Sequence, residues 1–183
     1  MTDNPRGKIL IATTKMTDYV FQNSVIYVHT DDDTGSIGVI LNISMEPTMA
    51  MKFAEDINWP HPAEIHLGGP VEPQLGYVIH TNDYARETSI MLNDALCYTG
   101  GRHIVDDIHR SVGPYEFVLM TGYCQWAPRQ LADEVADGLW IETEFDIDYF
   151  FNNLGREEGW EFAVHIASEN KTNNLLNMFD KSS

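Results

Sequence analysis

The pattern of apolar and polar residues predicts short strands interrupted by a few helices. Apolar, β-branched runs at residues 8–13, 24–29 and 36–41 are typical of buried strands. The segment 30–35 between the second and third runs is rich in Asp, Thr and Gly, so we expect these two runs to form a hairpin. Further strands are predicted at residues 76–81, 88–92, 95–99, 115–121 and 140–145.

Apolar residues that recur every three or four positions predict four helices. The clearest runs from Pro47 to Ile57, where the proline suits the first helical turn. A second helix is expected at 102–110, with Thr99 acting as its cap. The third opens at Pro128 and ends near Gly138, and the fourth covers 156–167. Strands and helices alternate without a regular βαβ order.

The chain is expected to be one mixed α/β domain spanning residues 1–183. No internal repeat of 20–50 residues divides it, and no linker separates a second domain. Residues 1–7 are polar and are interpreted as a flexible arm. Residues 168–183 are interpreted as a tail that adds a short amphipathic turn.

Composition favours a folded protein with a strongly acidic surface. Hydrophobic residues make up 43% of the chain, whereas 28 Asp and Glu against 11 Lys and Arg give a net charge of −17. This balance argues against direct binding to nucleic acid or to anionic lipid, both of which require clustered Lys and Arg. The charge is interpreted mainly as an aid to solubility, and an acidic patch for a basic partner is the alternative. No apolar run approaches the roughly 20 residues of a membrane helix.

Two cysteines, Cys97 and Cys124, are too few for a disulfide framework and indicate a reducing, cytoplasmic compartment. Cys124 lies in the segment 122–128, which is expected to join a strand to a helix. Amide groups at the start of that helix would lower the pKa of the thiol and make it a candidate reactive group. The alternative is a small buried side chain at a tight turn.

Common catalytic and nucleotide-binding motifs are absent, so isolated polar groups supply the remaining candidates. His103 and Asp107 would share a helix face, but two ligands do not make a metal site. The segment 68–71 (Gly-Gly-Pro-Val) is read mainly as a structural turn, and His80 either as a pocket residue or as a buried, hydrogen-bonded histidine.

The helix after Trp126 offers a further candidate surface. Gln130 and Glu134 are four residues apart and therefore share a face, away from the apolar positions. Together with Tyr123 and Trp126 they would form a polar and aromatic recognition surface. The alternative is an ordinary helix surface beside a packed tryptophan.

Several segments, in order along the chain, resemble the bacterial AlgH/YqgE family. The resemblance rests on the opening Gly-Lys-Ile-Leu-Ile-Ala-Thr at 7–13, the strand at 24–28 and Gly-Ser-Ile-Gly-Val-Ile-Leu-Asn at 35–42. It continues through the segments 68–71 and 76–80 and through the spaced residues of 122–140. The match runs from about residue 7 to residue 167. The chain departs from the family pattern at Thr14, Leu75, Cys124, Gln125 and Arg129.

The resemblance implies a branched, mostly antiparallel sheet that curls into a pseudo-barrel with helices around it. It implies a cytosolic bacterial protein with no established catalytic activity and with a transcriptional-regulator label. It also suggests a binding groove formed by the residues at the family's motif positions. These are Asp18, Asn42, Gly69, His80, Tyr123, Trp126, Gln130 and Glu134. For Asp18 and Asn42, hydrogen bonding to local backbone is the alternative.

We therefore expect a non-enzymatic binding or regulatory domain, without cofactor or metal. Its partner would be a protein or a small molecule, and any effect on transcription would pass through a protein partner. The basic residues around 102–110 are interrupted by Asp106 and Asp107, so direct DNA binding is not expected. The alternative is a hydrolase or thiol enzyme that uses Cys124.

Overall fold

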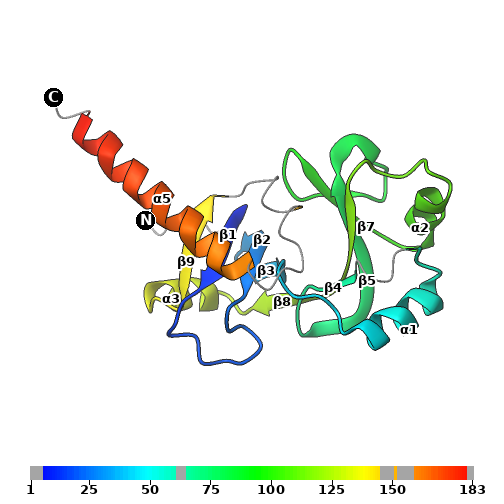
Figure 1. Ribbon diagram of the computed structural model, residues 1–183, viewed down its shortest axis with the longest axis horizontal. Helices are drawn as coiled ribbons and strands as arrows, with labels where there is room; N and C mark the ends of the chain where they lie inside the picture. The colour runs from blue at the N-terminus through cyan, green and yellow to red at the C-terminus, as the bar shows by residue number, and fades with distance from the viewer. Residues whose placement is uncertain (1–5, 61–64, 145–150, 152–158, 181–183) are drawn as a thin grey trace.

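The computed structural model describes residues 6–60, 65–144, 151 and 159–180 (Figure 1). Most of the expected arm at 1–7 and the first residues of the helix expected at 156–167 lie outside these ranges. Nine strands occur within them. They are β1 (Lys8–Ala12), β2 (Val25–Asp32), β3 (Gly35–Ile40), β4 (Ile65–Leu67), β5 (Val71–Thr81), β6 (Ile90–Met91), β7 (Leu96–Gly100), β8 (Phe117–Trp126) and β9 (Trp140–Glu144).

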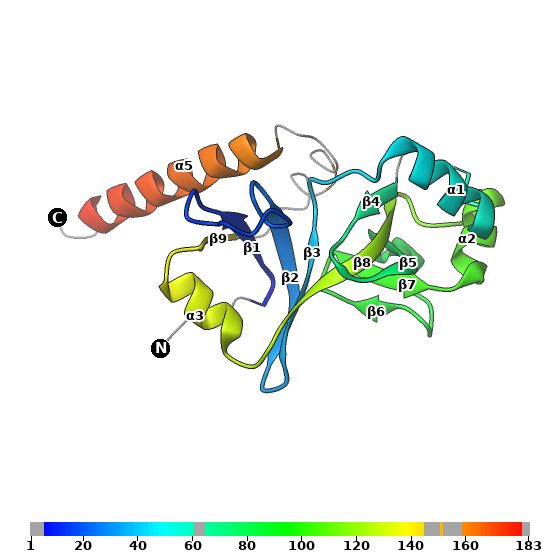
Figure 2. The ribbon, with the colours of Figure 1, turned by 90° about the horizontal axis from the view of Figure 1, so that it is seen from below.

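These strands form one branched sheet with the order β6-β7-β5-β8-β3-β2-β1-β9. β4 branches from this path and pairs in parallel with β8, whereas every other pairing between the named strands is antiparallel. The sheet curls, and Figure 2 shows β8 passing from the half covered by α1 and α2 to the half beside α3. The expected branched, mostly antiparallel, curled sheet is therefore confirmed.

Four α-helices lie around the sheet in the described ranges: α1 (Pro47–Ile57), α2 (Arg102–His109), α3 (Gln130–Ala136) and α5 (Gly159–Asp180). α1 has clear end signals. Its first residue is Pro47, the Glu46 carboxylate accepts from the Met49 amide at 3.1 Å, and Asn58 ends it in a left-handed conformation. None of the helices found in these ranges combines the length and apolarity needed to cross a membrane.

Several predicted strands are longer in the structure than the sequence suggested. β2 continues to Asp32 because the tight hairpin turn is confined to the residues between β2 and β3. β8 extends to Trp126, so the segment 122–126 is the end of a strand and not a junction. β5 starts at Val71, and the three-residue β4 was not predicted. Polar or short segments of this kind join a sheet through pairing with distant strands, which local pattern does not show.

The predicted helix ends also need correction. Gly101, not Thr99, is the N-cap of α2, because the Thr99 hydroxyl is already bonded within the sheet. α3 begins at Gln130, two residues after Pro128, and Arg129 caps it in a left-handed conformation. The tail expected at 168–183 is not a separate turn up to Asp180, because α5 continues through it.

The core consists of three hydrophobic clusters separated by the sheet. Alternate residues of β1 and β2 enter different clusters, so Ile9 and Tyr27 face α5 whereas Leu10 and Ile26 face the α3 side. This explains why these strands are apolar at successive positions. The third cluster lies between the sheet and helices α1 and α2. β8 contributes to all three, through Met120, Cys124 and Leu119 among others.

β8 changes partners between Tyr123 and Cys124, next to Gly122, where the loop of Gly68 and Gly69 crosses it. Its first half pairs with β5, and its last three residues pair with β3. A Cβ atom at Gly69 would lie 2.2 Å from the carbonyl carbon of Tyr123, and one at Gly122 would lie 2.4 Å from the Gly69 oxygen. Gly122 also has a φ of 65°, which side chains disfavour. The crossing therefore requires glycine on both segments.

Substitution at this crossing is expected to unfold the protein or to weaken it strongly. We predict that Gly122→Ala lowers the free energy of unfolding by at least about 3 kcal/mol, because a backbone clash adds to the strained φ. Gly100→Ala is the matched control, since a Cβ there meets no atom within 4 Å. Urea denaturation followed by circular dichroism measures both, and equal midpoints would contradict the prediction.

Candidate functional site

Trp126, Gln130 and Glu134 form a closed hydrogen-bond network at the corner between β8 and α3. Glu134 Oε2 accepts from Trp126 Nε1 at 3.0 Å and from Trp140 Nε1 at 2.8 Å. Glu134 Oε1 accepts from Gln130 Nε2 at 2.9 Å, and Gln130 Oε1 accepts from the Ala127 amide at 3.0 Å. Both indoles are buried and meet edge to face. These groups satisfy one another and tie the strand to the helix.

Asp18 and Asn42 hold backbone segments at the start of β2. Asp18 Oδ1 accepts from the Val20 amide at 2.9 Å, which is an Asx turn. Asn42 Oδ1 accepts from the Val25 amide at 2.8 Å, and its Nδ2 donates to the Asn23 carbonyl at 2.8 Å. Both side chains therefore make the backbone contacts that were the alternative to a ligand role.

His80 is a fully buried histidine with a partner at each ring nitrogen. Nδ1 lies 2.8 Å from the Thr81 carbonyl, and Nε2 lies 2.9 Å from the Thr99 hydroxyl. Because the carbonyl can only accept, Nδ1 carries the proton and the Thr99 hydroxyl donates to Nε2. Burial lowers the pKa of the imidazole, which keeps it neutral. The geometry matches a hydrogen-bonded core histidine.

Strand alternation places Tyr123 and Trp126 on opposite faces of β8. Tyr123 packs with Tyr77 against the cluster below α5, whereas Trp126 packs on the α3 side. Gly69 presents only backbone beside Tyr123. The structure therefore brings Trp126, Gln130 and Glu134 together at one corner and Gly69 together with Tyr123, but it does not gather all eight residues of the expected groove.

Cys124 has the opposite environment from the one expected of a reactive thiol. It lies inside β8, is fully buried, and its Sγ donates to the Gly68 carbonyl at 3.4 Å. Burial raises the pKa of the Cys124 thiol, and a backbone hydrogen bond from Ile40 offsets this only in part. The expectation of a lowered pKa at a helix start is wrong, because α3 begins six residues further on, at Gln130.

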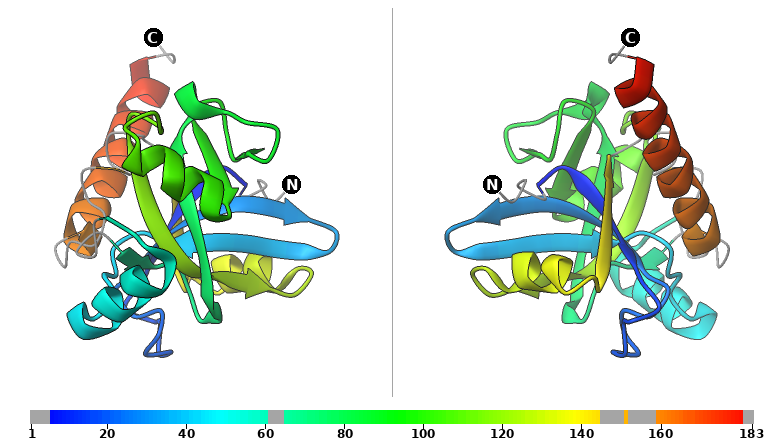
Figure 3. Two further views of the ribbon diagram at one scale, coloured as in Figure 1. Left: turned by 90° about the vertical axis from the view of Figure 1, so that its right-hand side faces the viewer. Right: turned by 90° about the vertical axis from the view of Figure 1, so that its left-hand side faces the viewer.

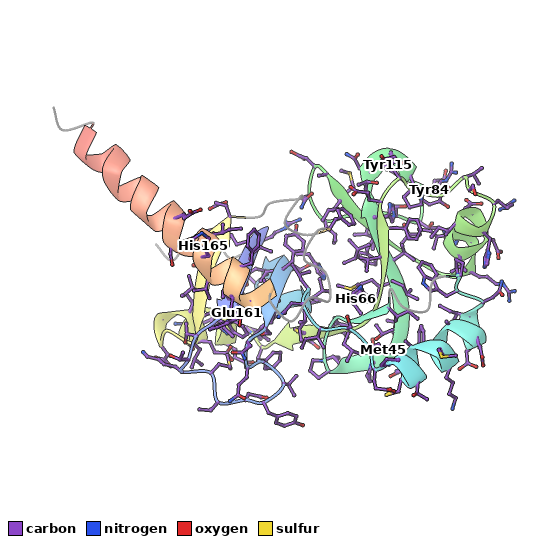
Figure 4. All side chains as sticks on the ribbon, viewed as in Figure 1. Met45, His66, Tyr84, Tyr115, Glu161 and His165 are labelled. Atoms are coloured by element: carbon purple, nitrogen blue, oxygen red, sulfur yellow. The ribbon has the colours of Figure 1, made fainter. Side chains whose placement is uncertain are left out.

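His103 and Asp107 bind different side chains and share no partner among the hydrogen bonds that follow. His103 Nε2 lies 3.0 Å from the Thr88 hydroxyl. Asp107 accepts from the Tyr84 hydroxyl at 2.6 Å and from Arg110 at 2.5 Å; Figure 4 labels Tyr84 near α2. Within the residues that the structure describes, no group of three or more His, Cys, Asp or Glu side chains is placed to hold a metal ion.

A cavity of about 210 Å³ lies where the two halves of the sheet meet. The hairpin of β2 and β3 forms one wall, and β5, β7 and the turn before β7 form the other. Three tyrosines and a histidine interrupt an otherwise aliphatic lining. The lining residues are His29, Ile37, Val39, Leu75, Tyr77, Ile79, Leu92, Tyr98 and Tyr123.

The polar groups of this cavity are neutral and partly engaged. The Tyr77 hydroxyl donates to the Gly122 carbonyl at 2.8 Å, so the cavity wall is tied to the glycine crossing. Burial raises the pKa of Tyr77, and burial followed by the nearby Glu72 raises the pKa of Tyr123. Burial, followed by the charge of Arg6, lowers the pKa of His29 to about 4. The cavity therefore suits an uncharged ring with few polar atoms.

Of the cavity residues, the sequence analysis named only Tyr123 as a candidate site residue, and Leu75 only as a departure from the family pattern. Tyr77 and Tyr98 lie in strands with ordinary alternating patterns, and nothing local distinguishes their rings from core aromatics. The antiparallel register, with Tyr98 opposite Ile79, brings the two rings within 5.8 Å of each other.

Removing the Glu134 carboxylate should destabilise the corner between β8 and α3. Glu134→Ala leaves two buried indole N–H groups without an acceptor, and we predict a loss of about 2–4 kcal/mol in unfolding free energy. Asp133→Ala on the same helix is the control, because Asp133 is exposed. Thermal and urea denaturation compare the two variants. Equal stability would show that the network contributes little.

The thiol of Cys124 should be unreactive in the folded protein. In a Cys97→Ala background, we predict that a disulfide reagent at pH 7–8 labels Cys124 at least about 100-fold more slowly than in unfolded chain, because the thiolate is buried. The absorbance of the released thiol measures both rates. Rapid stoichiometric labelling of the native protein would overturn this reading.

Comparison with known proteins identifies clear relatives. The family model described as AlgH-like matches residues 9–170. A UPF0301 protein of Ruegeria pomeroyi is 34% identical over 168 residues, covering 87% of this chain and 90% of the relative. A UPF0301 protein of Rhizobium etli is also 34% identical, covering 80% of this chain and 78% of the relative.

Solved structures share the fold. The solution structure of the AlgH protein from Pseudomonas aeruginosa superposes with a TM-score of 0.73 at 23% identity, covering 89% of this chain and 88% of that one. A crystal structure of a Corynebacterium diphtheriae protein gives a TM-score of 0.63 at 20% identity, covering 81% of this chain and 78% of that one. The sequence matches and the shared fold agree with the resemblance seen in the strand and glycine motifs, and the chain belongs to the AlgH-like family.

Proposed function

We propose that this protein is a non-enzymatic binding and regulatory domain whose binding site is the tyrosine-lined cavity. The observation that carries this proposal is the placement of three tyrosine rings in an open cavity at the junction of the two sheet halves. Elsewhere, the candidate polar groups at the α3 corner and at His80 bond to one another or to backbone. The cavity walls are strands of one continuous sheet, which provides a preformed site.

Binding is favoured over catalysis because the cavity lacks a reactive pair. Covalent or acid–base catalysis needs a nucleophile or base within hydrogen-bond reach of a partner that activates it. Of the lining residues, only His29 is a candidate base. Its Nδ1 lies 2.9 Å from the Thr30 hydroxyl, and burial leaves its pKa about 4. Cys124 lies in the cluster on the α3 side of the sheet and does not line the cavity, which weakens the alternative of a thiol enzyme or hydrolase.

A regulatory role would act through a partner and not through direct contact with DNA. Arg102 pairs with Asp106 and Arg110 pairs with Asp107, at 3.9 and 2.5 Å, so the two arginines at the ends of α2 are neutralised locally. The net charge of −17 opposes binding to phosphate backbones. Two buried free cysteines support a cytoplasmic setting, where thiols remain reduced.

Filling the cavity should abolish binding of small neutral ring compounds. We predict that indole or phenol at about 100 times its dissociation constant stabilises the protein by roughly 2.7 kcal/mol, and that Ile37→Trp removes this effect. Ile37 lines the cavity and is only partly exposed. A thermal-shift series measures the stabilisation.

Ile141→Trp is the matched control, because Ile141 is a half-exposed isoleucine on β9 outside the cavity. Stabilisation that survives Ile37→Trp would place the ligand elsewhere. If no ring compound stabilises the wild-type protein at millimolar concentration, the cavity is not a ring-binding site and the proposal fails.

A further inference from the structure

We propose that the natural occupant of the cavity is an aromatic side chain from a positively charged segment of a partner protein. This inference rests on the proposed function, because it names what the cavity binds. Three features support it: the exposed apolar side chains Leu75 and Ile90 at the cavity, a volume suited to a single ring system, and acidic groups on the segments that form the cavity walls.

Two exposed apolar side chains extend the cavity lining onto the surface. Leu75 lines the cavity and is 50% exposed, and Ile90 on β6 is 52% exposed. Ile90 pairs directly with the cavity residue Tyr98, so the two side chains share a face of the sheet. A molecule small enough to fit within the cavity would contact Leu75 but leave Ile90 in water. Exposed apolar groups around a pocket are typical of protein interaction sites, where a partner covers them.

The cavity volume matches one aromatic side chain. At about 210 Å³ it is smaller than the 300–1,000 Å³ typical of pockets for drug-sized ligands. A ring that enters it meets the faces and edges of Tyr77, Tyr98 and Tyr123, and aromatic pairs prefer such offset or edge-to-face contacts. Buried aromatic anchors of this kind contribute much of the affinity in protein interfaces.

Acidic groups on both walls favour a basic segment. The β2–β3 hairpin supplies Ile37 to the cavity and carries Asp32 and Asp33 at its tip. Glu72 interacts with the hydroxyl of the cavity residue Tyr123. Figure 3 shows the hairpin and the loop that carries β6 extending from the same side of the molecule.

The same charges argue against a second copy of this chain as the occupant. Two chains with a net charge of −17 each repel one another, and the acidic hairpin would face itself or another acidic surface. Arg6, whose charge acts on His29, is a nearby cation, but it is outnumbered by the carboxylates of the hairpin and Glu72. A lysine- or arginine-rich segment gains both steering and contact energy here.

Four dye-labelled or free probes test this inference by fluorescence anisotropy and competition. They are the peptide Lys-Lys-Lys-Trp-Lys-Lys-Lys, its Trp→Ala counterpart, its counterpart with Glu in place of every Lys, and N-acetyltryptophanamide. We expect the basic tryptophan peptide to bind at least about tenfold more tightly than each of the other three, a difference of about 1.4 kcal/mol. Ile37→Trp should abolish its advantage over the alanine peptide, whereas Ile141→Trp should not.

A charge variant tests the acidic wall separately. Asp33→Lys, on the exposed hairpin turn, should weaken the basic tryptophan peptide by about threefold or more at low salt. Glu55→Lys is the control. Glu55 is an exposed residue of α1 that does not line the cavity, and its substitution changes the net charge by the same amount. Equal effects of the two variants would mean that only the overall charge matters, and would overturn the role of the hairpin.

The outcomes separate this inference from the proposed function. If the tryptophan and alanine peptides bind equally, the partner does not insert an aromatic side chain, and this inference fails even if small neutral rings bind in the cavity. If N-acetyltryptophanamide binds as tightly as the basic peptide, the site takes a small molecule, and only the partner is overturned. If no probe containing a ring binds, both the inference and the proposed function fail.

Discussion

The backbone contact between Gly69 and Gly122 is the constraint on which the rest of this structure depends. β8 pairs with β5 up to Tyr123 and with β3 from Cys124 onward, and next to this change of partner the loop of Gly68 and Gly69 crosses the strand at close range. The Gly68 carbonyl accepts from the Ile40 amide at 2.8 Å, and the Gly68 amide donates to the Thr121 carbonyl at 2.8 Å. One short loop thereby connects both halves of the sheet.

This crossing divides the interior into three clusters and determines how each candidate residue is used. The last residues of β8 lie on the α3 side of the sheet, where Cys124 and Trp126 are buried in one hydrophobic cluster. A thiol in that position is a packing group. The buried indole N–H of Trp126 needs an acceptor. The Glu134 carboxylate accepts from it and also from the indole N–H of Trp140. Burial of polar groups explains these contacts without a ligand, since buried donors must be paired.

The same crossing creates the cavity. The cavity lies between the β2–β3 hairpin and strands β5 and β7, and three tyrosine rings line it. Tyr77 is held by its hydrogen bond to the Gly122 carbonyl, so the wall of the cavity is tied to the glycine contact itself. The other candidate groups bond to one another or to backbone, and this open aromatic cavity is the place where we propose that a partner binds.

Much of this protein was determined by its sequence alone: the hairpin of β2 and β3, the end signals of α1, the mixed fold class and the membership of the AlgH-like family. These depend on local pattern or on motifs that follow one another along the chain. Tertiary structure alone decided that Tyr123 and Trp126 face different clusters, that Cys124 is buried within a strand, and that Tyr77 and Tyr98 meet in a cavity. The reason is physical: facing, burial and pairing depend on strand register between segments far apart in sequence, which no local pattern specifies.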